Sequence, residues 1–182
     1  MEKKLHAVKI VSKSRDIAFS GLLIAMVFVA TRFINIRLPI SVNGGLIHLG
    51  NVMLFATAIV FGKKKGALAG AFGMGIFDIF SPYMIWAPFT FVIRGVMGLI
   101  VGSIAYSKDN DGDNVFLNVI GIILSGIWMI GGYYVTEGIL YGNWITPVTS
   151  IPGNVAQLVV GLVFGIPLAI ALKRVMKKAN LI

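Results

Sequence analysis

The chain has 182 residues and a formal net charge of +9, with 57% hydrophobic and only 13% charged residues. Soluble domains carry about 25% charged residues, so this composition excludes an ordinary soluble protein and indicates an integral membrane protein. The basic residues form short clusters between apolar segments, a pattern that fits membrane topology rather than nucleic-acid binding.

The apolar segments, taken in chain order, predict six transmembrane helices that form a single membrane domain over residues 1–182. The expected spans are residues 16–35, 46–62, 66–82, 86–106, 115–140 and 152–173. At about 20 apolar residues per span, the length leaves no room for a soluble domain. The predicted fold class is therefore an all-α integral membrane protein, built as a six-helix bundle.

Positive charge predicts the orientation of these helices. Lysines and arginines gather in the amino-terminal tail, at residues 63–65, at Lys108 and in the carboxyl-terminal tail, whereas the opposite side holds Arg32 and Arg37. The positive-inside rule therefore predicts that both termini are cytoplasmic. All three tryptophans and most tyrosines fall on or near the outer half, which predicts a partly apolar pocket that opens to the outside.

Three ionisable residues lie within the apolar segments: Asp78, Arg94 and Glu137. A guanidinium at bilayer depth costs at least ~2.5 kcal/mol, and intramembrane charges usually face a polar interior or mark a functional site. Arg94 is therefore predicted to bind ligand, although an ion pair that only fixes helix register is the alternative. Asp78 is either a site residue or a hydrated residue near the outer end of its span. Glu137, one turn before Tyr141, is favoured as a site residue over an interface anchor.

The sixth span begins with IPGNVAQLVVG, and Pro152 fits the first turn of a helix. Asn154 and Gln157 are three residues apart, so their amides share one helical face. They either bind a polar ligand or form hydrogen bonds between helices. His48 is predicted to lie at the pocket rim or the membrane interface. No metal site is expected, because the other histidine, His6, is on the tail and no third nitrogen or thiolate ligand lies nearby.

Small residues at positions 18, 21 and 25 form a smooth stripe on the first span, where a partner helix could pack. The sequence contains no cysteine and no phosphate-binding loop. It also offers no nucleophile paired with a histidine. The chain is therefore not expected to be an enzyme or to hydrolyse ATP.

Two segments carry a resemblance to a known family. The stretch from Gly44 to Gly102, with its LIHLGN and WAPF patterns, and the stretch from Ile151 to Gly161, with PGN..Q, resemble the S component of energy-coupling factor (ECF) transporters. The resemblance covers nearly the whole chain and is closest to the riboflavin-type and related vitamin branch. It implies a subunit of the prokaryotic plasma membrane that binds a vitamin tightly.

The same resemblance implies the partners and the site. The S component docks on a transmembrane T component and two cytoplasmic ATPases, so ATP is used by the partners and this chain binds no cofactor. The docking surface corresponds to Ala18, Gly21 and Ala25, with Gly21 in place of the first alanine of the usual Ala-x-x-x-Ala form. The implied substrate-binding residues are Asn43, Trp86, Arg94, Tyr133, Glu137, Tyr141, Trp144, Asn154 and Gln157.

The functional hypothesis is capture of a small water-soluble vitamin or precursor from outside, followed by inward delivery when the chain is docked. Riboflavin, pyridoxine, hydroxymethylpyrimidine and pantothenate remain open as substrates. The alternative is an autonomous proton-coupled secondary carrier of a small polar metabolite, with Asp78 or Glu137 as the proton site.

Overall fold

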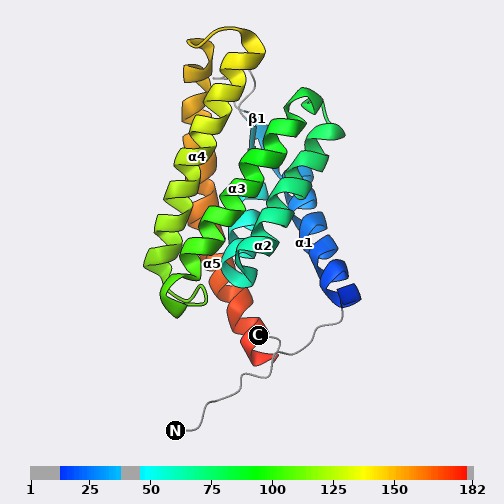
Figure 1. The fold of residues 1–182 in the computed structure, drawn as a ribbon, viewed down its shortest axis with the longest axis vertical. Coiled ribbons are helices and arrows are strands. Elements are labelled where there is room, and N and C mark those ends of the chain that lie inside the picture. The colour runs from blue at the N-terminus through cyan, green and yellow to red at the C-terminus, as the bar shows by residue number, and fades with distance from the viewer. Residues whose placement is uncertain (1–12, 38–45, 180–182) are drawn as a thin grey trace.

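The structure is a computed structural model that describes residues 13–37 and 46–179. Within these ranges the chain forms five α-helices and one pair of short strands (Figure 1). The helices are α1 (Lys13–Phe33), α2 (Gly50–Ile79), α3 (Ala87–Ala105), α4 (Val115–Tyr141) and α5 (Ile151–Lys178). Three 3₁₀ helices, Met84–Trp86, Ser107–Asp109 and Thr146–Ser150, lie in the connections.

Helix α2 lies at the centre of the bundle. It contacts α1, α3 and α5, while α4 packs on α3 and α5. The core between these helices is apolar and includes Phe55 and Ile59 of α2, Met97 and Val101 of α3, and Met129 of α4. The predicted spans 16–35, 86–106, 115–140 and 152–173 correspond to α1, α3, α4 and α5.

The predicted spans 46–62 and 66–82 are joined in α2, which folds back on itself at Gly62. This glycine has a φ of 80°, in the left-handed region, and it is the non-helical residue inside α2. Beyond it, Gly66 lies against Ala58 and Gly70 against Leu54, so the two arms of α2 run antiparallel. The two arms correspond to the two predicted spans. Because Lys63–Lys65 are helical directly after the kink, the arms form one element, so the described residues contain five helices and the count of six is not confirmed.

The all-α prediction also needs correction between α1 and α2. Strands β1 (Asn35–Arg37) and β2 (Leu46–His48) pair antiparallel, with Asn35 opposite His48 and Arg37 opposite Leu46. The Asn35 side chain donates hydrogen bonds to the carbonyls of Thr31 and Arg32 in the last turn of α1. These bonds satisfy carbonyls that the helix leaves unpaired at its end, so the chain turns into a strand there.

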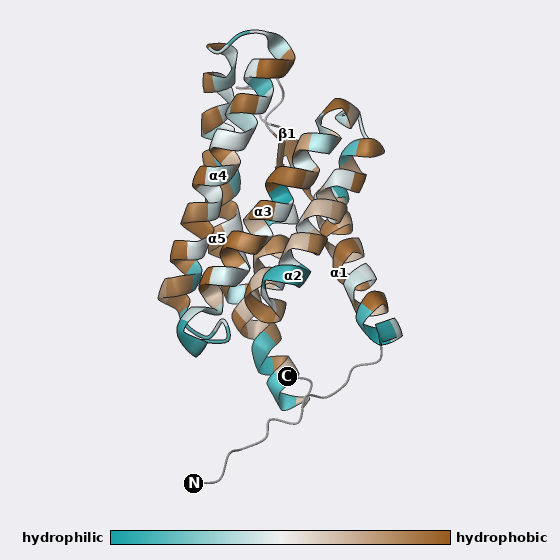
Figure 2. Cartoon of the chain, in the orientation of Figure 1, coloured by the Kyte–Doolittle hydropathy of each residue, from teal (hydrophilic) through white to brown (hydrophobic). Residues whose placement is uncertain are grey.

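Among the described residues, four segments are long and apolar enough to cross a membrane: Lys13–Phe33, Met84–Ala105, Val115–Tyr141 and Thr146–Lys178. Hydrophobic residues make up much of the length of these helices (Figure 2). Large apolar side chains such as Phe116, Ile127 and Phe164 are exposed in the isolated chain. Such a surface suits contact with acyl chains.

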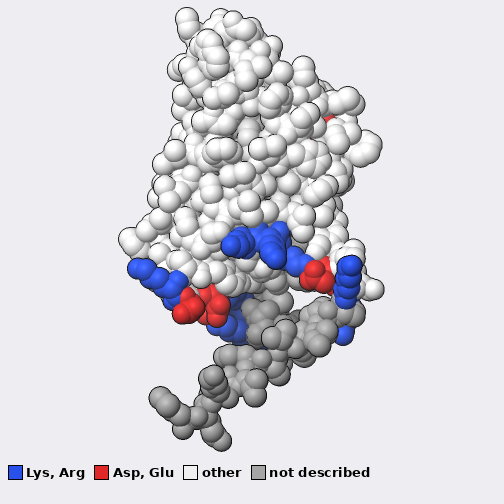
Figure 3. Space-filling model, viewed as in Figure 1, with Lys and Arg blue, Asp and Glu red and all other residues white. Residues whose placement is uncertain are grey.

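Charged side chains gather at one end of the bundle (Figure 3). We call this the charged end; it contains the start of α1, the turn of α2, residues 107–114 and the end of α5. Lys65 pairs with Asp16 at 2.7 Å, and Asp113 pairs with both Lys173 and Lys177 at 2.9 Å. The opposite end, which we call the cavity end, contains the site described next.

Candidate ligand-binding site

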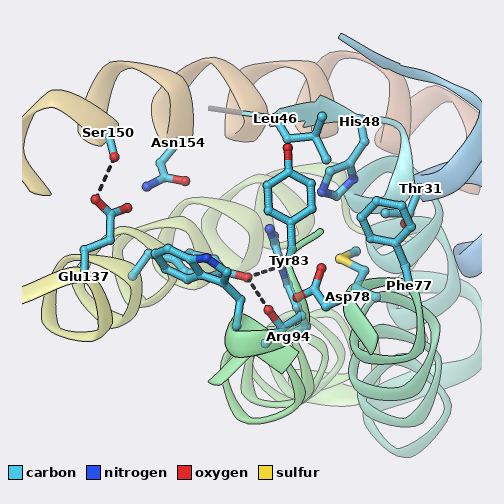
Figure 4. Close-up of a pocket in the computed structure, with 14 residues that line it drawn as sticks. Thr31, Leu46, His48, Phe77, Asp78, Tyr83, Arg94, Glu137, Ser150 and Asn154 are labelled. Carbon is cyan, nitrogen blue, oxygen red and sulfur yellow. Dashed lines mark hydrogen bonds between the residues drawn. The ribbon is translucent and has the colours of Figure 1, made fainter. Parts of the chain in front are cut away.

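A cavity of about 110 Å³ lies between the helices at the cavity end (Figure 4). Its wall combines aromatic rings, two carboxylates, a guanidinium, an imidazole, hydroxyls and an amide. The lining residues are Thr31, Leu46, His48, Met74, Phe77, Asp78, Tyr83, Trp86, Thr90, Arg94, Tyr133, Glu137, Ser150 and Asn154. A concave site with apolar walls and a few directed polar groups is typical of small-molecule binding.

Arg94 lies in the middle of α3 and only 5% of it is exposed. Its Nη1 donates to Asn51 Oδ1 at 2.6 Å and lies 2.9 Å from Met129 Sδ. Its Nε donates to the Tyr133 hydroxyl at 3.2 Å, and its Cζ lies 5.1 Å from the centroid of the Tyr133 ring. The cation is therefore held inside the bundle by neutral polar groups and an aromatic face.

The Tyr133 hydroxyl links Arg94 to Thr90. It accepts from Arg94 and lies 3.2 Å from Thr90 Oγ1. Thr90 and Asp78 both line the cavity, and the Asp78 carboxylate interacts electrostatically with Arg94. The opposite charges of Asp78 and Arg94 thus compensate each other in one network.

The side chain of Gln157 holds the backbone of β2. Its Oε1 accepts from the His48 N–H at 2.8 Å, and its Nε2 donates to the His48 carbonyl at 2.8 Å. Gln157 is 2% exposed and lies behind His48, outside the cavity lining. Both polar atoms of its amide therefore form hydrogen bonds within the protein, and Gln157 does not line the cavity.

The other side of the cavity is formed by α4, α5 and the 3₁₀ helix before α5. Ser150 Oγ donates to Glu137 Oε2 at 2.8 Å, and Asn154 lies next to this pair (Figure 4). The Trp86 ring lies 6.2 Å from the rings of both Tyr133 and Tyr141. These aromatic contacts place Trp86 where a flat ligand ring could stack on it.

The structure brings five of the predicted binding residues into the cavity wall: Trp86, Arg94, Tyr133, Glu137 and Asn154. It does not place the others there. Tyr141 lies behind Trp86, Trp144 packs on Tyr134, and Gln157 holds β2. Asn43 lies outside the described residues. The role of each residue in binding stays a prediction.

Several residues that line the cavity were not predicted from the sequence. Thr90 lies four residues before Arg94, and this helical spacing could have placed both on one face. Thr31, Phe77 and Tyr83 look like ordinary membrane-segment or turn residues. Ser150 gave no signal, because its partner Glu137 is on another helix.

The stripe predicted for partner docking lies on the outer surface of α1. Ala18, Gly21 and Ala25 are all exposed. No atom lies within 4 Å of the position that a Cβ would take on Gly21. The stripe is thus open in the isolated chain, and docking there stays a prediction.

Membrane-length helices around a buried polar cavity are typical of proteins that move a small polar ligand across a bilayer. The family model described as "ECF-type riboflavin transporter, S component" matches residues 11–174. The chain belongs to this family and is a multi-pass membrane protein.

Individual relatives agree with this assignment. The chain is 33% identical over 139 residues to an uncharacterised protein encoded in the gap 3' region of Pyrococcus woesei, covering 76% of this chain and 90% of that protein. It is 28% identical over 139 residues to the thiamine precursor transporter HmpT of Lactococcus lactis subsp. cremoris (strain MG1363), covering 76% of each. A solved S component of a bacterial ECF transporter shares the fold, with a TM-score of 0.68 over 91% of this chain and 99% of that one, at 19% identity.

Proposed function

We propose that this chain captures a small water-soluble vitamin or vitamin precursor outside a prokaryotic cell and delivers it inward when docked on an ATP-driven module. The observation that carries this proposal is the cavity lined by Asp78, Arg94 and Glu137 at the end of the bundle opposite the charged end. The positive-inside rule places the charged end in the cytoplasm, so the cavity faces outward.

The chemistry of the wall favours a ligand that donates hydrogen bonds. Asp78 and Glu137 are both buried and both offer acceptor oxygens to the cavity. Arg94 uses Nε and Nη1 on Tyr133 and Asn51, and it is one cationic group against two carboxylates in the wall. An amino- or hydroxyl-bearing ring, as in hydroxymethylpyrimidine or pyridoxine, can donate to these two carboxylates, whereas the carboxylate of pantothenate can pair only with Arg94. The similarity to a thiamine precursor transporter supports a pyrimidine ligand.

The aromatic part of the wall suits a flat ligand. The side chains of Phe77, Tyr83 and Trp86 line the cavity and can pack on the faces of a ring. Each of the heteroaromatic candidates, riboflavin, pyridoxine and hydroxymethylpyrimidine, has such a ring, so the family name by itself does not define the ligand of this chain.

Delivery depends on partners that this chain does not contain. A T component would pack on the exposed stripe of Ala18, Gly21 and Ala25, and two cytoplasmic ATPases would supply the energy. Docking can release the ligand only if the partner prefers a state with weaker ligand affinity. The isolated chain should therefore bind ligand without transporting it.

The test uses the purified chain in detergent and in liposomes. Tryptophan fluorescence is followed during titration with hydroxymethylpyrimidine, pyridoxine, riboflavin and pantothenate. We expect tight binding of one of the first two, and no accumulation in liposomes without the T component and ATPases. Accumulation by the isolated chain would contradict the proposal.

One feature favours the alternative of a proton-coupled carrier: Asp78 is buried and lines the same cavity as Thr90, whose hydroxyl lies at hydrogen-bonding distance from Tyr133. Buried membrane carboxylates near other polar groups can relay protons. Uptake that survives ATP depletion but collapses with the proton gradient would favour the carrier. Uptake that requires ATP and the partner subunits would exclude it.

A further inference from the structure

His48 occupies a position in the cavity wall that fixes the chemistry of its ring. It is the last residue of β2, lies directly before the amino terminus of α2, and is 6% exposed. Its Nδ1 accepts a hydrogen bond from the Gly50 N–H at 3.1 Å. A backbone N–H can only donate, so Nδ1 carries no proton, and the proton of the neutral ring is on Nε2.

Two further features support this tautomer. The Gln157 Nε2 that donates to the His48 carbonyl lies 3.3 Å from Nδ1, so a second donor faces the same ring nitrogen. The Gly50 N–H belongs to the amino terminus of α2, where Leu49 makes no side-chain cap, so the His48 ring accepts from the first turn of this helix in place of a cap. The positive end of the helix dipole also disfavours an imidazolium at this place.

Gly50 leaves room for the ring. A Cβ on this residue would lie 2.7 Å from His48 Nδ1 and would also overlap Thr31 Oγ1. Any side chain at position 50 would therefore displace the imidazole or Thr31. Together, Gly50 below the ring and Gln157 behind the strand determine where the ring of His48 lies.

We propose that His48 is a specificity-determining residue that presents an Nε2–H donor to the ligand, and that Gln157 and Gly50 are positioning residues that act through it. This inference rests on the proposed function for the existence of a ligand. His48 lies on one side of the cavity with Thr31 and Phe77, and Glu137 and Asn154 lie on the other (Figure 4). The ligand it selects has an acceptor, such as a ring nitrogen, on the His48 side and a donor for the carboxylates.

The first experiment tests the tautomer without any ligand. The chain is labelled with ¹⁵N-histidine, and long-range ¹H–¹⁵N correlation spectra are recorded in detergent at neutral pH, with His6→Gln to assign the two histidines. We expect a neutral His48 ring protonated at Nε2. We also expect that Gly50→Ala and Gln157→Glu alter this pattern. A ring protonated at Nδ1, or at both nitrogens, in the wild-type chain would overturn the inference.

The second experiment tests the donor with two matched variants. In His48→Gln the amide nitrogen can reach the place of Nε2, whereas in His48→Asn the amide reaches only the place of Nδ1. With 4-amino-5-hydroxymethyl-2-methylpyrimidine as the probe, we expect His48→Asn to lose affinity about 10-fold and His48→Gln to lose much less. Equal losses in the two variants would overturn the assignment of the donor.

Analogues of the probe identify the acceptor. In each of two pyridine analogues, one ring nitrogen is replaced by C–H. One of them should bind the wild-type chain about 10-fold more weakly than the probe but bind His48→Asn as well as the probe does. If both analogues lose the same factor in both chains, His48 does not contact a ring nitrogen and the inference is wrong.

Gln157→Glu tests positioning. The carboxylate can still accept from the His48 N–H but cannot donate to the His48 carbonyl. Affinity for the probe should fall about as far as in His48→Asn, and the double variant should lose no more. Additive losses would overturn the positioning role. If the wild-type chain binds none of the four vitamins, the proposed function fails, whereas the tautomer is decided by the spectra alone.

Discussion

The cavity end and the charged end of the bundle are built in opposite ways. At the cavity end, charged groups are buried and meet neutral hydroxyls and amides, as Arg94 meets Tyr133 and Asn51. At the charged end, ion pairs such as Lys177 with Asp113 are exposed, and the helices beneath them approach closely at glycines such as Gly98. The difference is that one end encloses a polar cavity, while the helices of the other end pack closely together.

The largest effect is expected when the buried cation of the cavity end is removed. Arg94→Ala removes a cation from the cavity wall and leaves Asn51 and Tyr133 without their charged partner, so any hydrogen bond from Arg94 to the ligand is lost. A hydrogen bond to a charged group contributes about 1.5–3 kcal/mol, so ligand affinity should fall about 10- to 150-fold in a fluorescence titration.

Arg32→Ala is the matched control for this variant. Arg32 is also an arginine toward the cavity end, but it is exposed on α1. Its removal should leave ligand affinity unchanged. If Arg94→Ala binds the ligand as tightly as the wild-type chain, Arg94 has a purely structural role. The buried charge at the cavity end would then not contribute to ligand binding.

The next largest effect is expected where the helices pack most closely. A Cβ on Gly98 would overlap the backbone of Gly66 and Ala67, so Gly98→Ala forces α3 away from α2. Such overpacking costs about 1–3 kcal/mol, which an unfolding titration in sodium dodecyl sulfate can measure. Gly131→Ala is the control, because no atom lies within 4 Å of its Cβ position on α4. Equal stability of the two variants would contradict close packing there.

Hydropathy and charge predicted the membrane class, the helical bundle and the approximate place of its helices. They also drew attention to Arg94, because a charge within an apolar run is visible in the sequence itself. They did not predict β1 and β2, because three-residue strands leave no periodic pattern. The predicted spans 46–62 and 66–82 correspond to the two arms of α2, but the one-glycine turn at Gly62 that joins them was not predicted.

Contacts between distant segments explain the remaining differences in the site. Gln157 was predicted to bind substrate, yet its amide pairs with the backbone of His48, 109 residues away. No spacing rule within one helix can reveal such a contact. The sequence also left the role of His48 open. The position of this residue is determined by hydrogen bonds with Gly50 and Gln157, and the partner Gln157 cannot be identified from the sequence around His48.

A small effect is expected from the ion pairs of the charged end. Hydrogen bonds from Lys173 and Lys177 lower the pKa of the Asp113 carboxyl. Because the folded-state pKa is lower than the unfolded one, the stabilisation is present above about pH 4 and is lost as the pH falls through the folded-state value. Asp113 is 55% exposed, so solvent screening limits the contribution to less than about 1 kcal/mol.

Unfolding titrations at pH 7 and at acidic pH measure this contribution. Asp113→Asn should lower the free energy of unfolding at pH 7. It should also reduce the further loss of stability that the wild-type chain shows at acidic pH. Asp109→Asn, at an exposed position in the same connection, is the control and should keep the pH dependence of the wild-type chain. A steeper pH dependence in Asp113→Asn would show that the pairing is not stabilising.

The smallest effect on the isolated chain is expected at Gly21, because its Cβ position is open and on the surface of α1. Gly21→Leu should change the free energy of unfolding by no more than about 0.5 kcal/mol and leave ligand affinity unchanged. If α1 receives the T component through small residues, the same variant should lose copurification with that partner and lose ATP-dependent uptake. Gly131→Leu adds the same side chain at an equally open position on α4 and should retain both. Normal assembly of Gly21→Leu would move the docking surface to another face, while the cavity end would keep its ligand.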